Sequence, residues 1–240
     1  MPREPIVHFQ RVSLVYPNLV RALEDIELEI APGEFVFLVG PTGCGKSTLL
    51  SLIYLAERPT TGRIRVLGQD VTDLPPMRVP FLRRKLGVVF QDYQLLEFKT
   101  VSENIAYALQ VIGAPPQEIE RKVPLALRMV GLEHKANMLP TELSGGEQQR
   151  TAIARAIINA PPILLCDEPT GNLDPDTSRE IVRLLTLINQ RGTTVIMATH
   201  DAHIVNTFKR RVVYMEDARK VWDQEQGEME LSDGKLRLLS

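Results

Sequence analysis

One run constrains the fold more than any other feature of the chain: Gly40-Pro41-Thr42-Gly43-Cys44-Gly45-Lys46-Ser47-Thr48. It matches the phosphate-binding pattern G-x-x-x-x-G-K-[ST] and lies between an apolar run and a helical stretch, as that pattern requires. Glycines let backbone N–H groups turn inward around phosphates, and the helix N-terminus adds positive potential. We therefore expect Lys46 to reach the terminal phosphates and Ser47 to ligate Mg²⁺. A Gly-rich turn alone would not explain the flanking strand and helix together.

Three largely apolar runs predict the middle of a parallel sheet, at residues 35–39, 163–166 and 193–198. Residues 23–30 have a different pattern, in which acidic residues alternate with the apolar residues Ile26, Leu28 and Ile30. This alternation predicts a half-buried antiparallel strand. Helices are expected at 47–57, 102–111, 117–130, 145–159 and 175–190, the last with Asp174 as N-cap and Pro175 in its first turn.

The order of these elements predicts an α/β fold with a helical insertion. We expect a single domain over residues 1–240, in which 1–91 and 160–240 form a β subdomain and the catalytic core. Residues 92–159 are expected to form the helical subdomain. The tail from Glu216 is expected to add one last strand or hairpin.

Composition excludes several classes of function. The 240 residues carry a net charge of -2, so no bulk attraction to nucleic acid is implied. Cys44 and Cys166 are too few for a disulfide framework and suit a reducing cytosol. No apolar stretch reaches the roughly 20 residues that cross a bilayer, and the start of the chain lacks the apolar core of a signal peptide. We therefore expect a soluble chain whose membrane role, if it has one, depends on a partner.

A second motif, Ile163-Leu164-Leu165-Cys166-Asp167-Glu168, ends a predicted buried strand with two acids. Beside a phosphate loop, we expect Asp167 to belong to the Mg²⁺ shell and Glu168 to orient and deprotonate an attacking water. The alternative is a strand that simply ends in solvated acids.

A third motif, Leu143-Ser144-Gly145-Gly146-Glu147-Gln148-Gln149-Arg150, predicts a second anion site. Ser144 is expected to cap the following helix, and the two glycines open its N-terminus. Because one nucleotide does not need two such sites from one chain, this motif indicates a dimer in which each chain completes the site of the other. An ordinary Ser-Gly-Gly helix start would leave residues 147–150 unexplained.

Six features of the sequence match, in order, the motifs of ABC-transporter ATPases. They are the phosphate loop, Gln91, the run 143–150, the Asp167-Glu168 pair, Gly171-Asn172-Leu173-Asp174 and His200. The chain resembles that family over nearly its whole length. The resemblance implies a P-loop NTPase (RecA-like) core with an antiparallel β subdomain and an inserted α-helical subdomain. It also implies ATP and Mg²⁺ as cofactors, hydrolysis of ATP to ADP and phosphate, and a homodimer on ATP binding.

The resemblance also implies roles for individual residues. Tyr16 would stack on adenine, Gln91 would touch Mg²⁺ and the attacking water, His200 would contact the γ-phosphate, and Asp174 would communicate between the two sites. The expected catalytic residues are Glu168, His200 and Gln91; the expected nucleotide-binding residues are Tyr16, Gly40, Pro41, Thr42, Gly43, Cys44, Gly45, Lys46, Ser47, Thr48, Ser144, Gly145, Gly146, Glu147 and Asp174; and the expected metal ligands are Ser47, Gln91 and Asp167.

The stretch from Arg78 to Asp92, which contains Val79-Pro80-Phe81-Leu82-Arg83-Arg84, resembles the cell-division branch of the family. Resemblance to that branch implies that an integral membrane partner resembling FtsX holds the chain at the cytoplasmic face of the plasma membrane. The same resemblance implies that this partner activates cell-wall hydrolases. The main alternative is the ATPase of a lipoprotein-release or macrolide-export transporter. A stand-alone phosphoryl-transfer enzyme would not explain the run 143–150, and a DNA-maintenance ATPase would need a long coiled coil that is absent here.

The two cysteines allow two interpretations. Both can be small tolerated residues, which is the simpler hypothesis. Alternatively, the positive phosphate site lowers the pKa of Cys44 and makes it sensitive to alkylation.

Overall fold

The computed structural model describes residues 4–225, 229–232 and 235–238, so Met1 to Arg3 and residues 226–228 of the tail discussed above lie outside the described residues. The strands are β1 (Val7–Val15), β2 (Arg21–Ile30), β3 (Phe35–Val39), β4 (Thr61–Val66), β5 (Gln69–Asp70), β6 (Leu86–Val89), β7 (Ile163–Asp167), β8 (Thr194–Thr199), β9 (Arg211–Glu216), β10 (Arg219–Gln224), β11 (Met229–Ser232) and β12 (Lys235–Leu238). The helices are α1 (Lys46–Ile53), α2 (Val79–Arg83), α3 (Val101–Val111), α4 (Pro116–Val130), α5 (Gly145–Ile157), α6 (Pro175–Gln190) and α7 (Ala202–Phe208), and the 3-10 turns are η1 (Pro76–Arg78), η2 (Glu133–Lys135) and η3 (Pro140–Glu142).

The larger sheet has the order β10-β9-β3-β8-β7-β6. Strands β9, β3, β8, β7 and β6 run parallel to their neighbours, and β10 closes the edge antiparallel to β9. Every residue of β3 and β8 is buried, as expected for strands covered on both faces. The three runs predicted for the centre of the sheet, β3, β8 and β7, are therefore confirmed.

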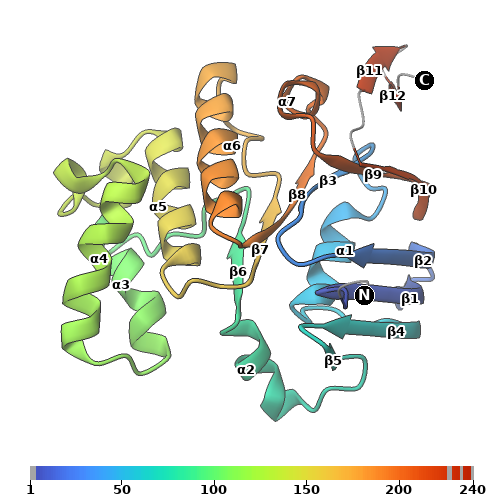
Figure 1. Cartoon of the computed structure of the whole chain (residues 1–240), viewed down its shortest axis with the longest axis horizontal. Helices are drawn as coiled ribbons and strands as arrows, with labels where there is room; N and C mark the ends of the chain where they lie inside the picture. Colours follow the sequence, from blue (N-terminus) through green and yellow to red (C-terminus); the bar gives the residue numbers. More distant parts are fainter. Residues whose placement is uncertain (1–3, 226–228, 233–234, 239–240) are drawn as a thin grey trace.

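The smaller sheet, of order β2-β1-β4-β5, is antiparallel throughout. On β2, Ile26, Leu28 and Ile30 are buried while Glu27 and Glu29 are exposed, which confirms the predicted alternation. Leu49 of α1 belongs to the same hydrophobic cluster as Leu28 and as Leu38 of β3. Helix α1 thus joins the two sheets into one core, and Figure 1 shows it beside the smaller sheet.

Helices α3, α4 and α5 pack against one another at the end of the molecule away from the smaller sheet (Figure 1). Their apolar side chains, such as Ile105, Leu127 and Ile153, share a cluster with Phe37 of β3. The α/β architecture is as expected. The division at residues 92–159 remains our proposal for where the helical subdomain lies.

Two short helices were not expected from the sequence, and the tail differs from its prediction. Helix α2 spans only 5 residues and α7 only 7, too short for a clear periodic pattern. The tail forms β10 and a further hairpin of β11 and β12 rather than a single last element. Trp222 stacks on Tyr214 with ring centroids 5.1 Å apart, and buried Met229 holds the start of β11 against the main core. These tertiary contacts explain the extra strands.

The model contains no helix, over the ranges that it describes, with both the length and the apolar character needed to cross a membrane.

Candidate nucleotide site

Four parallel strands end at one edge of the larger sheet, and each is followed by residues of the expected site. Gly40 follows β3, Glu168 follows β7, and His200 follows β8. Gln91 lies two residues beyond the end of β6. Open α/β sheets bind ligands outside the carboxyl ends of their strands, so this edge is the candidate site.

The phosphate loop has a backbone that only glycine fits at two positions. Gly40 has φ +149° and Gly45 has φ +104°. A Cβ atom would lie 2.1 Å from the Met215 carbonyl oxygen at the first position and 2.5 Å from that of Ala22 at the second. At these two positions the loop therefore packs directly on neighbouring backbone, and only glycine leaves room for that approach.

Lys46 lies inside this loop. Its side chain is 4% exposed, and its ammonium donates to the carbonyl oxygens of Gly40 at 2.9 Å and Pro41 at 3.0 Å. A buried ammonium needs such partners. The geometry places a buried positive charge beside two carbonyl oxygens of the loop.

Cys44 does not have the reactive character of the sharper hypothesis. It is buried, and burial raises the pKa of its thiol despite the nearby Lys46 ammonium. Burial also raises the pKa of Cys166, which is fully enclosed in β7. The hypothesis of a low thiol pKa at Cys44 is therefore wrong, because desolvation of the thiolate outweighs the attraction of one cation.

Asp167, the last residue of β7, contacts the Ser47 hydroxyl of the phosphate loop. Ser47 Oγ donates to Asp167 Oδ1 at 2.9 Å, and burial together with the neighbouring Glu168 raises the pKa of Asp167. Within the described residues, no three His, Cys, Asp or Glu side chains form a ready-made metal site. The pair nevertheless fits Mg²⁺, which is commonly held by one or two protein oxygens together with substrate phosphates.

Glu168 contacts both a cation and an imidazole. Its Oε1 is 3.9 Å from Lys46 Nζ, and its Oε2 is 3.1 Å from His200 Nδ1. The residue has φ +47°, an uncommon backbone conformation for a non-glycine residue and one often found at active sites. Glu168 and His200 line one cavity of about 230 Å³ together with Thr199 and Gly171.

Gln91 and Tyr16 lie at two further sides of the site. A Cβ atom on Gly171 would lie 3.0 Å from Gln91 Nε2, so the Gln91 amide lies against the loop that follows Glu168. The Tyr16 hydroxyl is 3.4 Å from Thr48 Oγ1, which places its ring beside the start of α1. The structure thus brings together the expected residues from the phosphate loop, residues 167–168, Gln91 and His200.

The run 143–150 forms a second, separate group. Ser144 caps α5, and Glu147 completes the capping box by accepting from Ser144 N at 2.9 Å. Lys135 lies 2.9 Å from Glu147, and the hydrogen bonds from Lys135 and the Ser144 amide lower the pKa of Glu147 to about 2. In the described part of the chain, the polar contacts of Ser144 and Glu147 stay within this group and do not reach the phosphate loop.

Asp174 belongs with this second group. It caps α6 by accepting from the backbone N–H groups of Asp176 and Thr177, both at 3.0 Å. A Cβ atom on Gly146 would lie 2.5 Å from the Thr177 methyl group, so the start of α5 packs closely on the start of α6. Hydrogen bonds from Thr177 lower the pKa of Asp174.

Sequence reasoning missed Asn104, which is fully buried in α3. Its amide donates to the carbonyl oxygens of Leu96, Lys99 and Thr100 at 3.1, 2.8 and 3.1 Å, and its oxygen accepts from Leu96 N at 2.8 Å. Asn104 thereby fixes the segment that follows Gln91. An asparagine inside a helix is an unfavoured choice, and that was the available signal.

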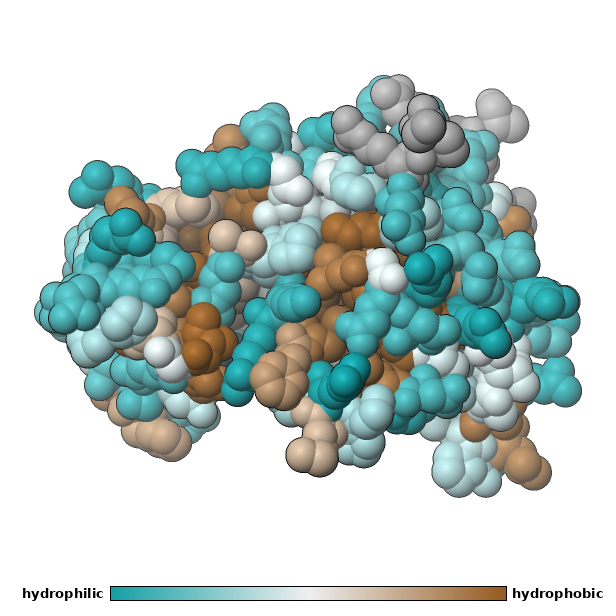
Figure 2. All heavy atoms as spheres, turned by 60° about the horizontal axis from the view of Figure 1, so that its bottom comes forward, coloured by the Kyte–Doolittle hydropathy of each residue, from teal (hydrophilic) through white to brown (hydrophobic). Residues whose placement is uncertain are grey.

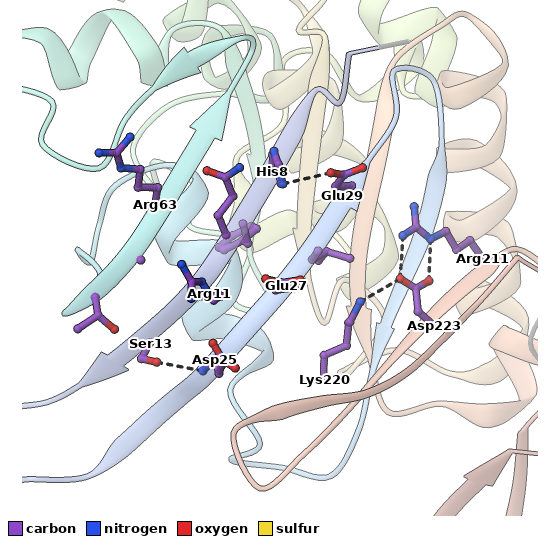
Figure 3. Close-up of a pocket in the computed structure, with 15 residues that line it drawn as sticks. His8, Arg11, Ser13, Asp25, Glu27, Glu29, Arg63, Arg211, Lys220 and Asp223 are labelled. Atoms are coloured by element: carbon purple, nitrogen blue, oxygen red, sulfur yellow. Dashed lines mark hydrogen bonds and ion pairs between the residues drawn. The ribbon is translucent and has the colours of Figure 1, made fainter. Parts of the chain in front are cut away.

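Another large hollow lies elsewhere, between the outer face of the smaller sheet and the β9–β10 hairpin (Figure 3). It has a volume of about 980 Å³ and contains none of the expected site residues. Several of its charged side chains pair with one another, as in the His8–Glu29 pair at 3.1 Å and the Arg211–Asp223 pair at 2.8 Å. The edge with convergent catalytic groups is therefore the better candidate.

Comparison with known families identifies the combination of motifs. Residues 23–171 match a family model described as ABC transporter. This range includes the phosphate loop, Gln91, the run 143–150 and the Asp167-Glu168 pair.

Curated relatives match nearly end to end. The cell division ATP-binding protein FtsE of Bacillus subtilis is 52% identical over 223 residues, which cover 93% of this chain and 98% of that protein. The proteins of the same name from Mycobacterium tuberculosis and Escherichia coli K12 are 53% and 47% identical, over 92% and 88% of this chain and 97% and 96% of theirs.

Solved structures agree with the fold. The dimeric ATP-binding cassette MJ0796, in a post-hydrolysis state bound to ADP and Pi, has a TM-score of 0.83 at 36% identity, covering 91% of this chain and 98% of its own. CbiO1 of Clostridium perfringens, part of the ABC transporter complex cbiONQ, has a TM-score of 0.86 at 31% identity, covering 93% of this chain and 89% of its own.

Proposed function

Because this chain belongs to the ABC transporter ATPase family, and so binds nucleotide and hydrolyses ATP, we propose that it is the ATPase subunit of an FtsEX-like membrane complex in bacterial cell division. The observation that carries the catalytic part is the position of Glu168 between Lys46 and His200. The family and the names of the relatives support the cell-division part.

We propose that the phosphate loop from Gly40 to Thr48 holds the nucleotide phosphates, with Lys46 on the terminal ones and the Tyr16 ring on adenine. Lys46 already lies within the loop, so it needs only to exchange two carbonyl partners for phosphate oxygens. The exchange is favourable because a phosphate oxygen adds the attraction of its negative charge for the ammonium, which a neutral carbonyl oxygen lacks.

Ser47, Asp167 and Gln91 would hold Mg²⁺, which supplies charge neutralisation to the phosphates. Asp167 has its pKa raised by burial, so a cation beside it would favour its ionised form. The Ser47 hydroxyl would turn from Asp167 toward the metal. Ser47 and Asp167 already lie in contact, 2.9 Å apart, which keeps the reorganisation small.

Glu168 would accept the proton of the attacking water and His200 would contact the γ-phosphate. The carboxylate of Glu168 faces the cavity that His200 also lines, where a water can lie between the base and a phosphate in the loop. Backbone strain at Glu168 suits a residue whose side chain must point away from its own strand.

The second anion site would act on the nucleotide of a partner chain. Ser144, Gly145, Gly146 and Glu147 form a preorganised helix start that makes no polar contact with its own phosphate loop among the described residues. Two chains placed head to tail would therefore enclose two ATP molecules, and Asp174 would lie between the sites. ATP favours this closed dimer only through its contacts with both chains.

Closure would be passed to an integral membrane partner resembling FtsX, which places the chain at the cytoplasmic face of the plasma membrane. That partner would activate cell-wall hydrolases on the far side, with no cargo moved. The alternative partner is a lipoprotein-release or macrolide-export permease, for which the ATP chemistry would be the same.

The test is to purify tagged Glu168→Gln protein from its native membranes in Mg-ATP and to identify the membrane protein that comes with it by mass spectrometry. Recovery of a small FtsX-like protein is expected. Recovery of an export or lipoprotein-release permease instead would overturn the cell-division role and leave the ATPase mechanism intact. A Lys46→Ala sample serves as the matched control for nucleotide dependence.

A further inference from the structure

The short segment of η1 and α2 exposes apolar side chains to solvent, although other apolar side chains of the segment are already buried in the core. Val79 and Leu82 point into the core, with 8% and 4% of their surface exposed. On the outside, Met77 is 87% exposed and Phe81 is 61% exposed. Met77 lies on η1 and Phe81 on the adjoining α2, so one short segment carries two exposed apolar side chains, which we call the apolar pair.

This segment is held rigidly from both sides. Arg83 donates to the carbonyl oxygens of Tyr54 at 2.9 Å and Leu55 at 3.0 Å, which ties α2 to the end of α1. Arg58 donates to the Leu74 carbonyl oxygen at 2.5 Å, which fixes the loop before η1. The apolar pair is therefore displayed on a preorganised base rather than on a loose loop.

The charge around the pair is positive. Residues 74–90 contain four basic side chains and no acid, within a chain of net charge -2. In the described part of the molecule, neither Arg84 nor Lys85 forms a salt bridge, and Arg84 lies 5.3 Å from the centroid of the Phe81 ring. The positive charge of Arg78 is partly offset, because Arg78 lines a hollow together with Asp70 and Asp73.

A hollow of about 300 Å³ lies beside the pair, between α2 and the β4–β5 turn. Leu67, Phe81 and Leu82 make its apolar part, while Arg78 and Lys85 lie at its edge with Gln69. Helix α2 is at the bottom of Figure 1, and Figure 2 turns that side forward. Figure 2 shows apolar side chains there interspersed with hydrophilic ones.

We propose that the segment of η1 and α2 is a docking surface for an anionic lipid bilayer. Met77 and Phe81 enter the headgroup region while Arg84 and Lys85 face lipid phosphates. A bilayer accepts protruding apolar tips and unpaired cations together, because basic side chains extend toward the headgroups. A peptide seated in the hollow of about 300 Å³ would leave Met77 uncovered, because Met77 does not line that hollow, whereas a flat bilayer surface takes up both tips. This inference goes beyond the proposed function, since it requires neither ATP nor the membrane partner.

The test is flotation of the purified full chain with two kinds of vesicle, phosphatidylcholine alone and phosphatidylcholine mixed with phosphatidylglycerol. We expect binding to the mixed vesicles only, weakening as salt is raised. The double variant Arg84→Gln, Lys85→Gln should weaken it about 25-fold, because each cation near an anionic surface contributes about fivefold. The double variant Met77→Ser, Phe81→Ser should lower it by a similar order.

The matched control is Arg183→Gln with Leu187→Ser on α6, an exposed cation and an exposed apolar residue four positions apart on another helix. This control should leave vesicle binding unchanged. The inference is overturned if the wild-type chain ignores phosphatidylglycerol, or if the α6 control weakens binding as much as the α2 variants. It is equally overturned if the α2 variants bind vesicles normally but lose the copurifying membrane protein, because the surface would then belong to that partner. Because the vesicles contain no protein and no nucleotide, the vesicle results are independent of the proposed function.

Discussion

Oε2 of Glu168 lies 3.1 Å from Nδ1 of His200, across the carboxyl ends of the adjacent strands β7 and β8. The same carboxylate is 3.9 Å from the ammonium of Lys46. One acid thus joins three parts of the site, although Lys46 lies 122 positions before it and His200 lies 32 positions after it.

Replacement of Glu168 by Gln should abolish turnover while ATP still binds. Loss of a general base lowers rates by about 10²–10⁴-fold, and the amide keeps the shape of the side chain. The ATP-bound dimer should therefore accumulate. Size-exclusion chromatography in saturating Mg-ATP checks this, and a monomer under those conditions would refute the nucleotide-enclosing dimer for the isolated chain.

Replacement of Lys46 by Ala should act at an earlier step. The buried ammonium is the cation in the loop, so its loss should weaken nucleotide binding itself. Titration with a fluorescent ATP analogue measures the dissociation constant. We expect a rise of about tenfold or more, since a charge-assisted hydrogen bond contributes roughly 1.5–3 kcal/mol. Equal behaviour of the Lys46 and Glu168 variants would contradict the assigned roles.

Replacement of Asn104 by Ala should destabilise the fold by about 2–4 kcal/mol. The change removes four hydrogen bonds and takes the Asn104 side chain away from the part-buried N–H of Leu96 and the part-buried carbonyl oxygen of Lys99. Urea unfolding measures the loss. The control is Asn18→Ala, whose side chain is exposed and accepts from Val20 N, and which should stay within roughly 0.5 kcal/mol of wild type.

The ion pair of Glu147 with Lys135 should make stability depend on pH in the acid range. The folded pKa of Glu147 is lowered from 4.5 to about 2, so its contribution is present above pH 4.5 and is lost as the pH falls toward 2. Glu147→Gln should therefore cost about 1–2 kcal/mol at pH 7, allowing for solvent screening, and progressively less below pH 4.5. Unfolding curves of both proteins between pH 7 and pH 3 measure the difference. A gap that stays constant over this range would show that the ionised carboxylate is not what stabilises the start of α5.

Alkylation of Cys44 should be slow in the folded protein at neutral pH, because the thiol is buried and its pKa is raised. Mass spectrometry after a timed pulse of iodoacetamide measures the rate of Cys44 alkylation, and denatured protein supplies the fully labelled control. Addition of ATP should change the rate little. Rapid labelling of the folded chain that ATP blocks would restore the reactive hypothesis.

The sequence by itself determined the type of site and the order of its parts. Residue spacing predicted the phosphate loop at the start of α1, the two acids at the end of β7 and the serine cap of α5. Each of these features depends on contacts between residues close together in the chain. The buried runs of β3, β7 and β8 were predicted for the same reason, since a strand covered on both faces needs continuous apolar residues.

Only the tertiary structure decided what each side chain meets. The sequence placed a cation beside Cys44, but burial of the thiol determined that its pKa is raised. That burial depends on the packing of α1 against both sheets. Asn104 and α2 are further examples. Their partners, Leu96 on a loop and Tyr54 at the end of α1, are brought near only when the chain folds back on itself, which a local pattern does not encode.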